Sequence, residues 1–172
     1  MEPIPKEVIE MAEDFYLHLN KEEKKNLMVK YFKDQRALSV YYECAVEDFK
    51  FDWIKENGIM LYFVIVRCFQ YYNIILEPIS NDITQKTIRD FINNFTGRLN
   101  ETIDDEDLKL EMDLILHQKP LIDYIHFTIF GTDENPVKYD DSINWFIVYF
   151  PAVALVLVLN NEMKKHIGDE VN

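Results

Sequence analysis

The chain has 172 residues, a formal net charge of −13 at pH 7 and a hydrophobic content of 48%. This length and composition predict one domain over residues 1–172, large enough to bury a core of its own. The charge repels nucleic-acid backbones and anionic lipid surfaces, so it excludes a general grip on nucleic acid and argues against a membrane surface.

Helical periodicity and capping signals mark the first part of the chain. Residues 5–19 predict a helix. Its expected inward side chains share helical spacing: Val8, Ala12, Phe15 and Leu19. Asn20 ends that helix and, with Glu23, is expected to form a capping box for the next one. A third helix is predicted over residues 36–56, with Gly58 as part of its stop signal.

Two apolar stretches, at about residues 59–76 and 143–159, are too hydrophobic to lie on a water-exposed surface. We interpret both as central helices that other helices surround. The second approaches the roughly 20 residues that cross a bilayer, so a membrane-attached protein is an alternative. Pro151 predicts a kink or break near Tyr149, because proline lacks the backbone N–H and clashes with the preceding turn.

Caps and breakers predict shorter helices around these stretches. Ser80 is expected to cap one helix, acids open another over residues 104–117, and a proline starts a third over residues 121–130. Residues 132–141 are expected to form a polar loop. All four glycines fall at or just beyond predicted helix ends. Together these signals predict an all-α domain of about eight short-to-medium helices, packed as an irregular array and not as a four-helix bundle.

Few residues point to chemistry. Cys44 and Cys68 match no metal spacing, and two buried thiols in a reducing compartment are expected. The first residues lack the basic and apolar regions of a secretion signal, so we expect a cytoplasmic location. The sequence contains no phosphate-binding glycine loop and no nucleophile elbow. It therefore predicts no cofactor and no catalytic residue, and an enzyme is the less favoured interpretation.

The histidines provide the one chemical pattern that has to be weighed. Each follows an acid by three or four residues, which puts both side chains on one face of a helix. Helical metalloproteins use such pairs, so a metalloprotein or enzyme is the second hypothesis. Its candidate ligands are Asp123 with His126 and Asp113 with His117. Ordinary helix stabilisation explains the same spacing, so no metal is predicted by the leading interpretation.

Acids and aromatic rings provide that leading interpretation. One acidic run opens the helix predicted at residues 104–117, and other acids alternate with rings near residue 50. The residues expected to bind a partner are Asp104, Asp105, Glu106, Asp107, Asp48, Phe51 and Trp53. We hypothesise a non-enzymatic interaction module for a protein partner, with the charge favouring a basic one, as in inhibitor, immunity or adaptor proteins. The 22 Phe and Tyr residues could equally serve a core, a homo-oligomer seam or a ligand pocket.

Overall fold

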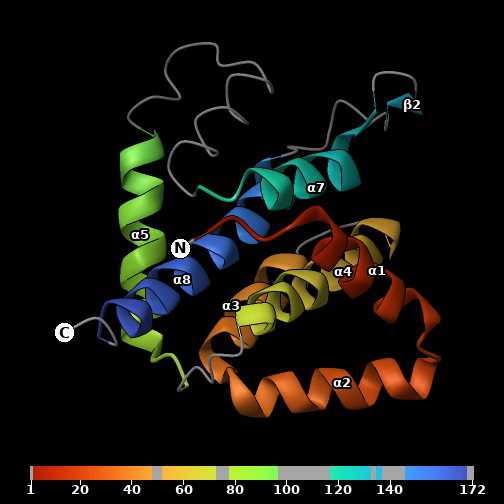
Figure 1. Ribbon diagram of the computed structural model, residues 1–172, viewed down its shortest axis with the longest axis horizontal. Helices are drawn as coiled ribbons and strands as arrows, with labels where there is room; N and C mark the ends of the chain where they lie inside the picture. The colour runs from red at the N-terminus through yellow and green to blue at the C-terminus, as the bar shows by residue number, and fades with distance from the viewer. Residues whose placement is uncertain are drawn as a thin grey trace.

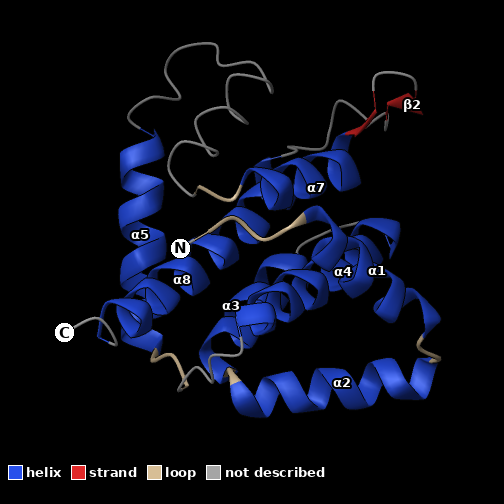
Figure 2. Ribbon diagram, viewed as in Figure 1, coloured by secondary structure: helices blue, strands red, loops and turns tan. Residues whose placement is uncertain are grey.

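A computed structural model describes residues 2–47, 52–72, 78–96, 117–132, 135–136 and 146–169. These residues form seven α-helices and one short 3-10 helix, so the predicted all-α fold is confirmed (Figures 1 and 2). The helices are α1 Lys6–His18, α2 Lys21–Asp34, α3 Arg36–Glu47, α4 Asp52–Phe69, η1 Gln70–Tyr72, α5 Asn81–Thr96, α7 Lys119–Phe130 and α8 Phe146–Asp169.

Helix starts follow the capping signals of the sequence. The Asn20 side chain accepts hydrogen bonds from the backbone N–H groups of Glu22 and Glu23, at 3.0 and 3.1 Å. The Glu23 carboxylate in turn accepts one from the Asn20 N–H at 2.8 Å, which completes the predicted capping box. Ser80 Oγ likewise accepts from the Ile83 N–H at 3.2 Å, at the start of α5. These bonds satisfy N–H groups that a helix cannot satisfy internally.

The connection after α7 is also close to its prediction. A proline occupies the first turn of α7, and Gly131 ends the helix with a φ of 78°, a value that glycine adopts without steric cost. Within the predicted polar loop, β1 (Gly131–Thr132) pairs with β2 (Asn135–Pro136) in a short antiparallel ladder.

The boundary between α3 and α4 differs from the prediction of one helix over residues 36–56. α3 ends at Glu47, and α4 begins at Asp52 and continues through Gly58. Glycine inside a helix costs about 0.5–1 kcal/mol. Gly58 is itself buried, and the apolar residues after it bury their side chains in the same helix, which offsets that cost. Gly168 is the residue before the end of α8 at Asp169, so it lies near a helix end as predicted.

We predicted a kink or a break near Tyr149; α8 continues through Pro151, so the break is wrong, and the kink stays a prediction. An internal proline costs about 3 kcal/mol, because one hydrogen bond is lost and the ring crowds the turn before it. Ala152, Val153 and Leu155 are fully buried directly after it. Burying a Val or Leu side chain contributes about 1.5–3 kcal/mol, so packing on the surrounding helices keeps α8 continuous.

The described parts of the two apolar stretches lie in α4 with η1 and in α8, and α4 and α8 pack against each other in the centre of the molecule (Figure 1). α1, α3 and α7 contact α4, whereas α3, α5 and α7 contact α8. In the part of the chain that the structure describes, no helix has the length and hydropathy of a membrane span.

Gln118, just before α7, connects the N-terminal segment to this centre. Its side-chain oxygen accepts a hydrogen bond from the Ile4 N–H at 2.9 Å, and its amide donates to Asn160 of α8 at 3.3 Å. All three residues are buried, and Ile4 is fully inaccessible to solvent.

Candidate functional site

Most residues that the sequence assigns to partner binding lie outside the described residues. These are Asp48, Phe51, Asp104, Asp105, Glu106 and Asp107. Trp53 belongs to the first turn of α4, but its side chain is also outside the described part. Their role in partner binding stays a prediction.

The candidate metal ligands are brought together only in part. Asp123 and His126 share α7, whereas Asp113 lies outside the described residues. His117 is exposed before α7 with a φ of 53°, outside any helix. Asp123 forms an ion pair with Lys119 at 3.2 Å, and the His126 ring packs on aromatic neighbours of its own helix. Among the described residues, no three His, Cys, Asp or Glu side chains are grouped to hold a metal ion.

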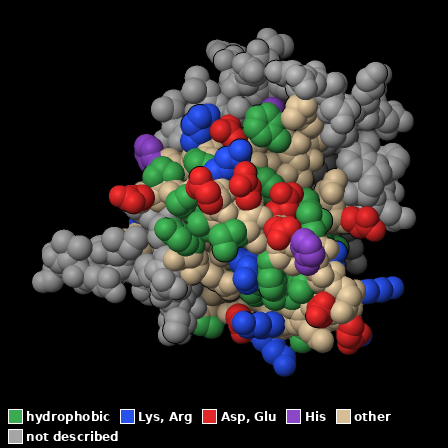
Figure 3. All heavy atoms as spheres, turned by 45° about the vertical axis from the view of Figure 1, so that its right-hand side comes forward, with side chains coloured by type: hydrophobic (Ala, Val, Ile, Leu, Met, Phe, Trp, Pro, Cys, Tyr) green, Lys and Arg blue, Asp and Glu red, His purple; other side chains and the backbone are tan. Residues whose placement is uncertain are grey.

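One exposed surface of α1 combines acidic and apolar side chains. We call it the acidic α1 surface, and its members are Glu7, Glu10, Met11, Asp14 and Leu17. Met11, in the middle of α1, is 72% exposed, and Leu17, in its last turn, is 59% exposed; both values are high for large apolar side chains. Figure 3 shows acidic and hydrophobic side chains interleaved on the side of the molecule that carries α1.

This surface exists because α1 is rotated relative to the predicted orientation. The sequence favours an inward face that includes Phe15, whereas the structure buries Ile9, Ala12 and Tyr16. Tyr16 determines the rotation, since its ring stacks on an aromatic ring of α4 with centroids 5.4 Å apart. Phe15 is therefore 36% exposed, and the Arg67 guanidinium covers its ring at 3.8 Å from the centroid. That cation–π contact gives the half-buried Arg67 a partner without an acid.

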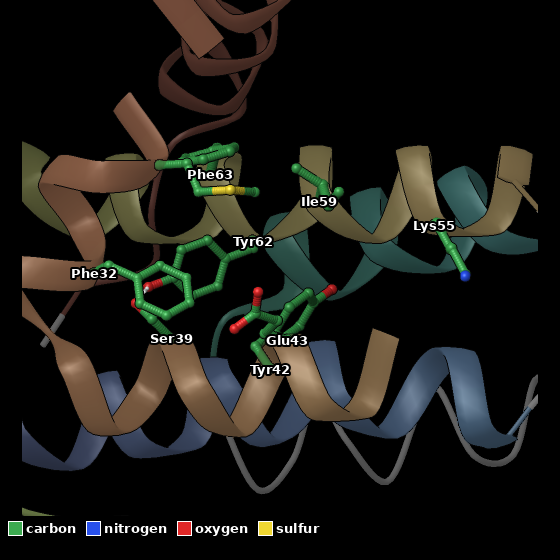
Figure 4. A pocket seen from close by; sticks show the side chains of 9 residues that line it. Phe32, Ser39, Tyr42, Glu43, Lys55, Ile59, Tyr62 and Phe63 are labelled. Carbon is green, nitrogen blue, oxygen red and sulfur yellow. Dashed lines mark hydrogen bonds between the residues drawn. The ribbon is translucent and has the colours of Figure 1, made fainter. Parts of the chain in front are cut away.

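A second candidate site is a cavity of about 180 Å³ between α2, α3 and α4 (Figure 4). Its wall is mostly aromatic and aliphatic. The side chains that make up this wall are Met28, Phe32, Tyr42, Ile59, Tyr62 and Phe63. Ser39, Glu43 and Lys55 are the polar residues that complete the described lining.

The hydroxyl groups that line the cavity are uncharged, and those of Ser39 and Tyr62 are used in hydrogen bonds within the protein. Ser39 Oγ donates to the Tyr31 carbonyl at 3.3 Å, and the Tyr62 hydroxyl lies 2.5 Å from the same Oγ, to which it donates. Burial raises the pKa of Tyr62 to about 12 and raises the pKa of Tyr42 still further above its ordinary value. Both phenols are therefore uncharged at neutral pH.

The two charged side chains of the cavity lie apart. Figure 4 shows Glu43 near Tyr42 and Tyr62, whereas Lys55 lies farther along α4, beyond Ile59; Glu43 is exposed to solvent. Within the described part of the chain, neither charge takes part in an ion pair.

The sequence does not locate this cavity. Its residues come from three helices, and residues 28 and 63 lie at the two extremes of a 36-residue segment. The excess of Phe and Tyr is the one signal in the sequence, and it does not distinguish a protein core, a homo-oligomer seam and a ligand pocket. No protein family matches the chain, and no curated protein or solved structure is significantly similar to it.

Proposed function

We propose that the protein is a non-enzymatic interaction module that binds a basic protein partner, with the acidic α1 surface as part of the contact. The observation that supports this proposal is the exposure of Met11 and Leu17 beside three acids on one helix. Binding interfaces typically combine apolar anchors with a charged rim, and methionine is enriched in them. The partner buries the apolar side chains, and its cations meet the acids.

The acids of this surface are available to a partner. Glu10 pairs with Lys6 at 3.3 Å and the Asp14 carboxylate lies 3.2 Å from the His18 ring nitrogen, but both contacts are highly exposed to solvent. Exposed ion pairs of this kind contribute about 0–1 kcal/mol, so a basic partner can replace them at little cost. The net charge of −13 adds long-range attraction that accelerates association with a basic protein.

The residues predicted from the sequence remain a second part of this proposal. Asp48, Phe51 and Trp53 near the start of α4, and the acids at residues 104–107, would extend the contact if the partner is large. Because they lie away from α1 in sequence, variants can test the two surfaces separately.

Affinity capture at low salt from an extract of the native host, followed by identification of the partner, provides the binding assay. One variant removes the three acids of the acidic α1 surface by Glu→Gln and Asp→Asn changes. A matched control removes three exposed acids elsewhere: Glu22, Asp82 and Asp90. We expect the first variant to associate with the purified partner about tenfold more slowly at low salt, and the control to associate nearly normally.

Equal effects of the two variants would show that only net charge matters and would contradict the role of α1. Met11→Ala tests the apolar part, because this side chain is too exposed to support the fold. We expect about a fivefold weaker affinity, mainly through faster dissociation. An unchanged affinity would remove Met11 from the contact.

A further inference from the structure

We infer that the cavity between α2, α3 and α4 binds a small organic ammonium ion that carries one aromatic ring. This site is separate from the acidic α1 surface and requires no protein partner. Three features support the inference: the size of the cavity, its aromatic walls and the position of the Glu43 carboxylate.

The size of the cavity limits the ligand to a single ring with a short chain. An apolar cavity of about 150 Å³ is sufficient for benzene, and this one measures about 180 Å³. Tyr42, Tyr62 and Phe63 are only 4%, 6% and 2% exposed, so the inner wall is deep in the protein. A ring seated there would lose most of its contact with water, as ligands in binding pockets do.

The charges at the cavity favour a cation. The rings of Tyr42 and Tyr62 pack on each other with centroids 5.2 Å apart, and the exposed Glu43 lines the same cavity (Figure 4). An ammonium group at the solvent side of the cavity would face these aromatic walls and the carboxylate together. Cation–π contacts attract an ammonium group to such walls. The overall negative charge of the protein also attracts cations.

The same geometry disfavours an anion. The hydroxyl donors of Ser39 and Tyr62 are already used, by the Tyr31 carbonyl and by Ser39 itself. An anionic ligand therefore gains no hydrogen bond from these two groups. Lys55 is the only cation among the described lining residues, and it lies beyond Ile59, away from the Glu43 carboxylate (Figure 4).

Three probes with the same ring and similar chain length test the inference: 2-phenylethylammonium, 2-phenylethanol and 3-phenylpropionate. Each is titrated into the full chain at pH 7 and low salt, with binding followed by calorimetry and by backbone amide chemical shifts. We expect a Kd for the ammonium of about 1 mM or lower. The alcohol should bind about tenfold more weakly, and the carboxylate more weakly again. No saturable binding of the ammonium, or equal binding of the carboxylate, overturns the inference.

Two charge variants test the assigned roles. Glu43→Gln should reduce ammonium affinity about five- to tenfold and leave the alcohol unchanged, because Glu43 is exposed and not part of the core. The matched change Lys55→Gln should leave ammonium affinity equal to or above that of the wild type. Undiminished ammonium binding in Glu43→Gln overturns the inference.

The location of the bound probe is tested independently. Ile59→Phe should fill the cavity and weaken all three probes, and the amides of Tyr62 and Phe63 should shift on titration of the wild type. If those amides do not shift, the ring binds elsewhere and the inference fails, whether or not the Ile59 variant folds. The variant without the three α1 acids should still prefer the ammonium, so this test and the partner-binding test fail separately.

Discussion

The two central helices are both buried, but they pack through different kinds of side chain. The buried side of α8 is mostly aliphatic after Pro151, with Val153, Leu155 and Val156 fully inaccessible, although Tyr149 before it is also fully buried. α4 presents Tyr62 and Phe63 to rings from α1, α2 and α3, and it borders a cavity. Aliphatic side chains fill space without needing polar partners, whereas tyrosine rings bring hydroxyl groups that must be satisfied. The two helices therefore differ in the polar groups that their packing has to satisfy.

The polar side chains around the two central helices also differ. Around α4, hydroxyl groups and Arg67 lie among the aromatic rings, and the Tyr31 hydroxyl lies beside Arg67 and Gln70. On α8, Asn160 is the one buried polar residue among the described side chains, and it bonds to Gln118. Substitutions in the two helices should therefore have different energetic and pH-dependent effects.

The largest expected difference comes from truncating one apolar side chain on each helix. Leu155→Ala should lower the free energy of unfolding by about 3–4 kcal/mol, because it opens a new cavity in a filled region. Ile59→Ala should cost about 1–2 kcal/mol, because Ile59 is half-buried and already faces a cavity. Urea unfolding measures both values. Equal losses would show that the α4 side is packed as tightly as α8.

Alkaline pH should destabilise the packing around α4. Burial raises the pKa values of Tyr62 and Cys68 to about 12, from 10.0 for the tyrosine and 9.0 for the thiol. Each group stabilises the fold fully below its unfolded pKa, and this stabilisation is lost as pH rises from there towards 12. Tyr62 alone accounts for about 3 kcal/mol.

Urea unfolding at a series of pH values, with phenolate absorbance, measures this loss. Tyr62→Phe should flatten the decline in stability between pH 10 and 12. Leu155→Ala serves as the control, because it should lower stability by the same amount at every pH. A decline of the same slope in the wild type and in Tyr62→Phe would contradict the assignment to Tyr62.

Two buried glutamines allow a finer test. Gln118 accepts from the Ile4 N–H at 2.9 Å, and Gln35 accepts from the Ile79 N–H at 3.0 Å. Gln118→Ala should cost about 2 kcal/mol, because a buried N–H loses its acceptor. Hydrogen exchange should then accelerate at Ile4 and not at Ile79, whereas Gln35→Ala should give the reverse. Acceleration at both amides in either variant would show that the segments around Ile4 and Ile79 open together.

The smallest expected effect is at the start of α2. Asn20→Ala removes the capping box and should cost about 1 kcal/mol. Ser80→Ala removes the corresponding cap of α5 and is the matched change on the α8 side. Thermal unfolding should show similar small decreases in the midpoint temperature for both variants, because a helix cap is a local contact and does not depend on which central helix is near. A loss above about 2 kcal/mol in either would mean that the cap also supports the core.

Local signals explain which parts of the fold the sequence predicts well. Asn20, Ser80 and Gly131 act within one turn of the chain, so their effect can be inferred from neighbouring residues. The helix does not stop at Gly58, and it does not break near Tyr149, for the opposite reason. Both penalties, of about 1 and 3 kcal/mol, are local, and packing against distant helices exceeds them.

The candidate sites depend on packing and were therefore not predictable from spacing alone. The exposure of Met11 follows from the stacking of Tyr16 on Phe63, two residues that are 47 positions apart. The alternative inward set of Ile9, Ala12 and Tyr16 also has helical spacing, so periodicity does not choose between the two faces of α1. The cavity similarly requires α2, α3 and α4 to be placed together.

The bond between Ile4 and Gln118 has a consequence for the order in which the chain acquires structure during synthesis. Its two residues are 114 positions apart, and the Tyr124 hydroxyl donates to Glu13 across 111 positions. The Ile4 N–H and the Glu13 carboxylate therefore gain these partners only after α7 has been made, although α1 can already pack on α4 through Tyr16 and Phe63. α2, whose capping bonds lie within three residues, can form its own start much earlier. The Ile4 segment is thus among the last described parts of the chain to be fixed in place.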